Sequence, residues 1–129
     1  MKLVIDTSIL IAYALKNEQA IRIIELIEEG LHTMYVSPLL VYEYKNVLRL
    51  NKFKFSKEYQ LEVLEKVNKL AEKVNPDIYT KFSRDKYDSH LLSLANYIQA
   101  DLLISDDKTL QKANHLTTSK IVAMNNLIL

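Results

Sequence analysis

The stretch KLVIDTSILIAYAL, residues 2–15, reads as a strand that leads directly into a helix. Lys2–Ile5 is a short apolar run that suits a buried strand. Thr7 or Ser8 is placed to cap a helix that continues through Ile9 to Lys16. A strand followed at once by a helix is the repeating unit of folds in which helices cover a parallel sheet.

The same alternation continues along the chain. Further strands are expected at Thr33–Ser37, Asp101–Ser105 and Ile121–Ala123, and further helices at residues 20–31, 38–50, 56–74, 87–99 and 107–113. Strands separated by helices pair in parallel, with the helices on the faces of the sheet. The sequence therefore predicts one α/β domain over residues 1–129, a three-layer α/β/α sandwich around a mainly parallel sheet.

Composition excludes several classes of protein. The 129 residues include one glycine, two prolines and no cysteine. So few turn residues argue against an all-β fold, and a single glycine leaves no glycine-rich phosphate loop. Without cysteine there are no disulfides, thiolate metal sites or cysteine nucleophiles. The expected location is the cytosol, since neither an export signal nor a membrane span is recognisable.

Two aspartates directly follow expected strands. Asp6 comes after KLVI, and Asp106 comes after LLIS. In an open parallel sheet, ligands bind beyond the carboxyl ends of the strands, so both side chains are expected at that edge. Asp101, at the start of its strand, is expected at the opposite edge.

Two further acids fall on the expected buried faces of helices. Glu43 completes a stripe made by Leu39, Leu40, Val47 and Leu50. Asp88 lies one turn before a stripe made by Leu91, Leu92, Ala95 and Ile98. A buried carboxylate is costly unless something compensates its charge.

Each acid also has a purely structural explanation. Asp6, Asp88 and Asp106 are each placed to cap a helix, and Glu43 is able to pair with a lysine or reach solvent. One cause accounts for all of them together, because carboxylates gather in one pocket when a divalent cation neutralises them. Oxygen ligands alone favour Mg²⁺ or Mn²⁺ over zinc.

The motifs around these acids resemble those of the PIN domain family, in particular its single-domain toxins from prokaryotic toxin–antitoxin operons. The matching segments are IDTSILIAYAL, SPLLVYEYKNVL and RDKYDSHLLSLANYIQADLLISDDKTL, and the resemblance spans the whole chain. It implies that Asp6, Glu43, Asp88 and Asp106 form the acidic site. Asp85 and Asp107 are the alternative ligands beside Asp88 and Asp106. Thr7 and Ser8 match positions that support the first aspartate.

The resemblance implies a metal-dependent ribonuclease. One or two Mg²⁺ or Mn²⁺ ions held by carboxylates lower the pKa of water and stabilise the charges of phosphodiester hydrolysis, which agrees with the reading of the acids themselves. The expected partners are RNA, a small antitoxin protein that blocks the site and a second copy of the chain in a homodimer. No membrane partner is expected.

RNA recognition is expected in a basic segment, because the net charge of +1 leaves no general basic surface. Residues 44–57, YKNVLRLNKFKFSK, contain no acid. Their basic side chains are Lys45, Arg49, Lys52, Lys54 and Lys57. Phe53 and Phe55 alternate with them, and basic groups with aromatic rings suit a single strand. The alternative is a solvated helix end whose phenylalanines pack inward.

Two other functions compete with the nuclease. A receiver-type signalling domain also places acids at the ends of parallel strands, but it needs an acid pair after the first strand, where this chain has only Asp6. An inactive PIN scaffold that binds RNA or protein is the other alternative. Cleavage that depends on a metal ion separates it from the enzyme.

Overall fold

A parallel sheet of five strands forms the centre of the described molecule. The structure is a computed structural model and describes residues 1–76, 86–114, 117 and 119–127. The strands are β1 (Lys2–Ile5), β2 (Thr33–Val36), β3 (Glu72–Lys73), β4 (Leu102–Ile104) and β5 (Lys120–Val122). Their order is β3-β2-β1-β4-β5, and every pair is parallel.

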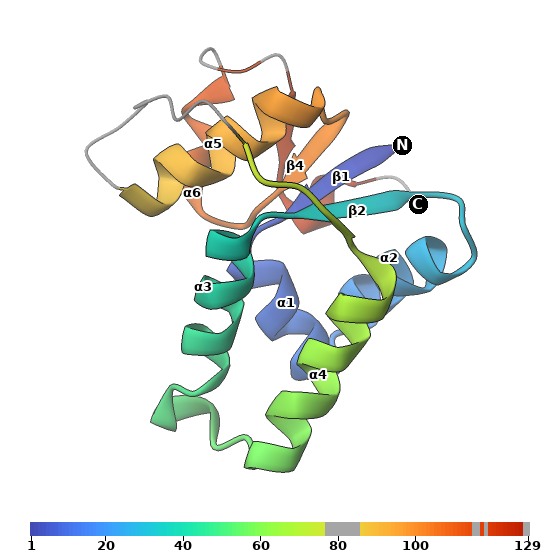
Figure 1. The fold of residues 1–129 in the computed structure, drawn as a ribbon, viewed down its shortest axis with the longest axis vertical. Helices are drawn as coiled ribbons and strands as arrows, with labels where there is room; N and C mark the ends of the chain where they lie inside the picture. Colours follow the sequence, from blue (N-terminus) through green and yellow to red (C-terminus); the bar gives the residue numbers. More distant parts are fainter. Residues whose placement is uncertain (77–85, 115–116, 118, 128–129) are drawn as a thin grey trace.

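Helices cover both faces of this sheet. They are α1 (Thr7–Ala14), α2 (Glu18–Glu28), α3 (Pro38–Leu48), α4 (Lys57–Leu70), α5 (Lys86–Ile98) and α6 (Lys108–Gln111), with 3-10 turns η1 (Asn51–Phe53) and η3 (Met124–Asn126). Figure 1 shows α1, α3 and α4 on one side of the strands and α5 on the other. Consecutive β1 residues from Leu3 to Ile5 are at most 1% exposed, as expected for a strand buried on both faces. The predicted α/β/α sandwich is confirmed. Within the described residues, no helix is both long and apolar enough to cross a bilayer.

The first helix begins at Thr7. Asp6, rather than Thr7 or Ser8, is the N-cap of α1, and its side chain accepts the backbone N–H of Thr7 at 2.7 Å. The structural explanation offered for Asp6 as a helix cap is therefore confirmed, because the carboxylate directly after the strand meets the first free N–H group of the helix. The geometry of the cap therefore fixes where this carboxylate lies.

The buried face of α3 differs from the predicted stripe. Leu40, Tyr44 and Leu48 are buried, whereas Leu39 and Leu50 are 45% and 46% exposed. The stripe was misplaced because Tyr44 was not counted as a core residue. Its ring is fully buried and its hydroxyl donates a hydrogen bond to the carbonyl of Ile5.

Helix α4 ends four residues before the predicted Val74. Ser56 caps it as expected, accepting the N–H of Tyr59 at 3.1 Å. After Leu70 the chain extends into β3, which pairs with β2, and the Val74 N–H donates to the Val36 carbonyl at 2.9 Å. The open edge of β2 offers these residues backbone partners that a longer helix would leave unpaired.

Candidate active site at the ends of β1 and β4

The candidate site lies between the carboxyl ends of two neighbouring strands. β2 and β3 extend the sheet on one side of β1, and β4 and β5 extend it on the other. A parallel sheet opens a crevice where its strand order reverses, which here is between β1 and β4. Asp6 follows β1, and its N–H donates to the carbonyl of Ile104, the last residue of β4, at 3.0 Å. The cleft at this point measures about 420 Å³ and is lined by Asp6, Thr7, Ser8, Ile11, Val47, Phe53, Tyr87, Asp106 and Asp107.

Asp6 is buried and surrounded by hydrogen-bond donors. It is 3% exposed. Its Oδ1 atom accepts the Thr7 N–H at 2.7 Å and the hydroxyl of Tyr87. Its Oδ2 atom accepts the hydroxyls of Ser8 at 3.0 Å and of Ser105 at 2.7 Å. These donors are neutral, so no cation among the described residues neutralises the carboxylate.

Tyr87 brings α5 to the site. Its hydroxyl donates to Asp6 and also accepts the Thr7 N–H at 3.2 Å. Burial raises the pKa of the Tyr87 phenol far above its ordinary value, and the charge of Asp6 raises this pKa further. The hydroxyl therefore stays protonated and acts as a donor to the carboxylate.

The acids after β4 take different positions. Asp107 is the N-cap of α6 and accepts the Thr109 N–H at 2.8 Å, so the predicted alternative to Asp106 has a structural role. Asp106 is exposed at the cleft. Its N–H donates to the Ser8 hydroxyl at 3.2 Å, and its Oδ1 atom accepts the Met124 N–H at 2.9 Å.

Glu43 and Asp88 lie on α3 and α5 and are not among the residues that line this cleft. Glu43 is half-buried next to the core stripe, not part of it. It lines a neighbouring pocket with Tyr87 and His90, so the ring of Tyr87 borders both spaces. Asp88, in the first turn of α5, is 7% exposed, as its place on the inward face predicts. Asp85 lies outside the described residues.

The sequence as a whole matches a known family. A family model described as a PIN domain matches residues 2–109. The chain belongs to the PIN domain family. No curated protein matches it at a significant level.

Two solved structures share the fold of this PIN domain. VapBC2 from Rickettsia felis, bound to a DNA fragment from its promoter, aligns with a TM-score of 0.70 and 14% identity, covering 95% of this chain and 98% of that one. PAE2754 from Pyrobaculum aerophilum aligns with a TM-score of 0.65 and 17% identity, covering 97% and 85% of the two chains. At these identities the likeness concerns the fold.

The donor chemistry of the PIN domain's cleft suits a divalent cation. Asp6, Asp106 and Asp107 supply only oxygen atoms, which Mg²⁺ and Mn²⁺ prefer, and the hydrogen-bond donors that the structure describes around the buried Asp6 charge are all neutral. In the part of the chain that the structure describes, however, no three acidic or histidine side chains lie close enough to share an ion.

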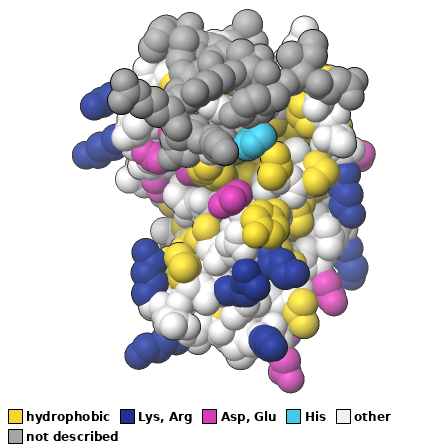
Figure 2. Space-filling view, turned by 60° about the vertical axis from the view of Figure 1, so that its left-hand side comes forward, with side chains coloured by type: hydrophobic (Ala, Val, Ile, Leu, Met, Phe, Trp, Pro, Cys, Tyr) yellow, Lys and Arg dark blue, Asp and Glu magenta, His cyan; other side chains and the backbone are white. Residues whose placement is uncertain are grey.

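The predicted basic segment borders the acidic cleft. Its side chains Lys45, Arg49, Lys52, Lys54 and Lys57 are exposed. Phe53 lines the cleft that holds Asp6, and it stacks on Phe55 with ring centroids 5.6 Å apart. Both rings are half-buried against the core, so part of each stays accessible. Figure 2 shows basic side chains below an area in the middle of this face where acidic and hydrophobic side chains lie.

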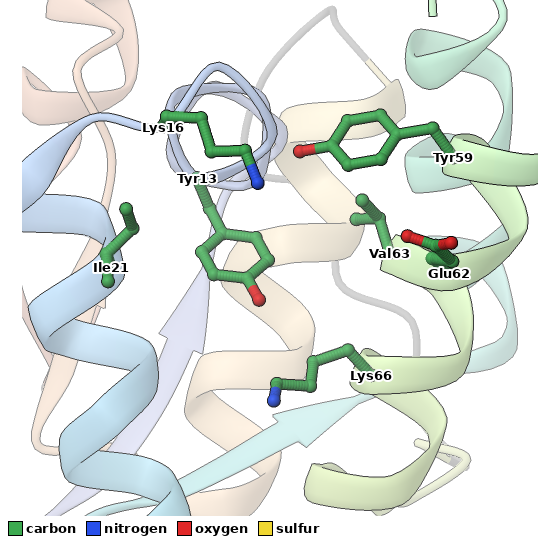
Figure 3. A pocket seen from close by; sticks show the side chains of 7 residues that line it. All are labelled: Tyr13, Lys16, Ile21, Tyr59, Glu62, Val63 and Lys66. Atoms are coloured by element: carbon green, nitrogen blue, oxygen red, sulfur yellow. The ribbon is translucent and has the colours of Figure 1, made fainter. Parts of the chain in front are cut away.

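A second cavity, of about 410 Å³, is separate from these acids. It lies between α1, α2 and α4, and Figure 3 shows Tyr13 and Lys66 on its walls. At its rim the Tyr59 hydroxyl donates to the Ala14 carbonyl at 2.6 Å. None of the predicted site residues lines it, so it is not part of the candidate active site.

Sequence reasoning missed Tyr87 and Ser105. Both donate to Asp6, and Ser105 is fully buried. The sequence could have indicated Ser105, because this hydroxyl residue lies directly next to Asp106 at the end of β4, just as Thr7 and Ser8 lie directly next to Asp6. The sequence gives little reason to select Tyr87, since a tyrosine next to Asp88 on a helix is typical of an ordinary core residue.

Proposed function

We propose that this PIN domain is a ribonuclease that hydrolyses RNA phosphodiester bonds with the help of Mg²⁺ or Mn²⁺. The supporting observation is the buried Asp6 carboxylate at the reversal of the strand order, which has only neutral donors among the described residues and shares its cleft with Asp106. The family match favours this function over a receiver-type signalling domain.

Asp6, Glu43, Asp88 and Asp106 would hold one or two cations. When bound, a divalent cation lowers the pKa of water and neutralises charge on the phosphate. The protein's part is to orient the carboxylates. The hydroxyls of Ser8 and Ser105 hold Oδ2 of Asp6, and the α1 backbone holds Oδ1. Glu43, in the neighbouring pocket that Tyr87 also lines, would bind metal or orient the attacking water.

Recognition of the RNA strand is assigned to the basic segment. Lys45, Arg49, Lys52, Lys54 and Lys57 would contact phosphates, and the accessible part of Phe53 would contact a base beside the scissile bond. This arrangement would separate the residues that cleave RNA from those that bind it. The exposed lysines next to the acidic cleft would offset the repulsion between RNA and the carboxylates.

The biological role we propose is that of a toxin in a toxin–antitoxin pair. The neighbour from Rickettsia felis is a VapBC protein, and the family resemblance points the same way. The partner would be a small protein that covers the cleft and inserts an arginine, whose guanidinium forks onto two carboxylates. A homodimer and a cytosolic location belong to the same proposal.

The first prediction tests the nuclease. Asp6→Asn and Asp106→Asn should each lower cleavage of a labelled single-stranded RNA by at least about a hundredfold, since even groups that only support a metal ligand affect activity ten- to a hundredfold. EDTA should abolish cleavage. Asp106 is exposed, so its substitution leaves the core intact.

Asp101→Asn is the matched control. Asp101 lies at the opposite edge of the sheet and accepts the Lys2 N–H at 2.7 Å, so cleavage should be unchanged. Full activity in EDTA, or in both site variants, contradicts the mechanism. Binding of RNA without cleavage in the presence of either metal ion would identify an inactive scaffold.

A further inference from the structure

The hydrogen-bonding capacity of Asp6 is fully used. A carboxylate offers about four lone-pair positions. The Thr7 N–H, the Thr7 hydroxyl at 3.3 Å and the Tyr87 hydroxyl donate to Oδ1, and the hydroxyls of Ser8 and Ser105 donate to Oδ2. A cation that binds Asp6 must therefore displace a donor.

Three of these donors are fixed by other contacts. The Thr7 N–H belongs to the first turn of α1 and has no freedom to leave. The buried Ser105 hydroxyl also accepts the Asp107 N–H at 3.0 Å. The Ser8 hydroxyl also accepts the Asp106 N–H at 3.2 Å. All three donors therefore belong to the two segments that follow β1 and β4, and their contacts hold these segments together around Asp6.

Tyr87 differs because it reaches Asp6 from another element. It comes from the first turn of α5, and its ring is half-buried between two open spaces. One space is the Asp6 cleft, and the other is the pocket of about 200 Å³ beside Glu43. The ring thus borders open space on two sides, and its hydroxyl, which also accepts the Thr7 N–H at 3.2 Å, is the donor to Asp6 that does not come from the ends of β1 and β4.

We propose that Tyr87 is a positioning residue that occupies the cation's place on Oδ1 of Asp6 and gives it up when a divalent cation binds. This inference rests on the proposed metal-dependent function. Without the cation, the Tyr87 hydroxyl stabilises a buried charge whose partners in the described part of the chain are all neutral. With the cation, the hydrogen bond is lost, so Tyr87 lowers the affinity of the site for metal.

The test is the affinity of the full chain for Mn²⁺, measured by titration calorimetry without RNA. Tyr87→Phe should bind Mn²⁺ roughly tenfold more tightly than the wild type, because a hydrogen bond to a charged group no longer has to be broken. Tyr59→Phe is the matched control. It also removes one hydroxyl donor, at the Ala14 carbonyl and away from the cleft, and should leave the Mn²⁺ affinity unchanged.

Proton NMR with Mg²⁺ gives a second readout that a purely structural tyrosine would not move. A hydroxyl proton shared with a buried carboxylate should resonate far downfield in the cation-free wild type. It should be absent in Tyr87→Phe and disappear from the wild type as Mg²⁺ is added. Its persistence at saturating Mg²⁺ would show that Tyr87 stays on Asp6, against the proposal.

The outcomes separate this inference from the proposed function. Metal binding that requires Asp6, with equal or weaker affinity in Tyr87→Phe, overturns the inference and leaves the function standing. Absence of Mn²⁺ binding in both proteins overturns the metal-dependent function and the inference with it. Binding by Tyr87→Phe alone supports the inference, since the tyrosine then blocks the site completely.

Discussion

Asp6 serves two purposes with one side chain. Its carboxylate caps α1 and is the most buried acid of the candidate site. Loss of the capping oxygen, as in Asp6→Ala, would cost the helix end about 0.5–2 kcal/mol, whereas Asp6→Asn keeps a capping oxygen but brings an NH₂ group among hydrogen-bond donors. Asp106 is exposed and does not cap α1, so Asp106→Asn tests the chemistry at the cleft without changing the end of that helix. Loss of activity in both variants is therefore stronger support than loss in Asp6→Asn alone.

Tyr44 supports a prediction about pH. Burial raises the pKa of its phenol well above the ordinary value, with smaller contributions from Tyr87 and Asp6. Above about pH 10 the unfolded chain releases this proton while the folded chain keeps it. The folded state then binds more protons, so stability should fall as pH rises above that point and be unaffected below it.

Tyr44→Phe removes this dependence. Urea unfolding between pH 8 and pH 11 measures the free energy of unfolding at each pH. Above pH 10 this free energy should fall with pH more steeply in the wild type than in Tyr44→Phe, by up to about 1.4 kcal/mol per pH unit. At pH 8 the variant should differ from the wild type only by the lost hydrogen bond to Ile5. Parallel slopes at high pH would mean that Tyr44 ionises as readily in the folded chain as in the unfolded one.

At the residue scale, sequence reasoning located charges better than hydroxyls. Asp6 and Asp106 fall at the cleft as predicted, because a strand end fixes where its next residue lies. Ser105 and Tyr87 were not predicted, because a neutral hydroxyl carries no burial penalty large enough to stand out in a sequence. The roles of all these residues in catalysis stay predictions.

At the element scale, the segment from α3 to the start of α4 supports a prediction about salt. Replacing Lys52, Lys54 and Lys57 with alanine should weaken RNA binding and reduce the slope of log affinity against log salt by up to about 0.7 for each lost phosphate contact. A fluorescence anisotropy titration of single-stranded RNA in EDTA, at several salt concentrations, measures this slope without cleavage.

The control for this segment is a triple substitution elsewhere. Lys69, Lys73 and Lys120 are exposed and lie outside the segment. Their replacement removes the same charge and should change the slope little. Equal effects of the two triple variants would mean that RNA binding follows net charge, and that the lysines around Phe53 have no special part in it.

Element types were predictable, but some of their limits were not. The periodic pattern of α4 continues through Ala71 and Val74, so the sequence favoured a longer helix. The sheet decides otherwise, because β2 needs a partner at its edge and residues 72–73 provide it. A pairing between segments far apart in sequence leaves no local pattern, which is why β3 was missed.

At the scale of the whole molecule, the proposed toxin role predicts an effect on cells. Expression of the wild-type chain without a partner should slow bacterial growth, because RNA is cleaved without restraint. Asp106→Asn should relieve the effect at the same protein level, and Asp101→Asn should not. Paired growth curves with immunoblots measure this. Equal, normal growth of all strains would contradict the toxin role.

The strand order has a consequence for synthesis of the protein on the ribosome. Asp6 is made almost at the start, whereas Ser105, which completes its hydrogen bonds, is 99 residues later. A nascent chain that has emerged only as far as β3 contains β1 but not β4, so it has no cleft. Because β4 must insert beside β1 to complete the cleft, a nuclease of the proposed kind would gain its site only after β4 has left the ribosome, and the unfinished polypeptide would spare the messenger RNA that is producing it.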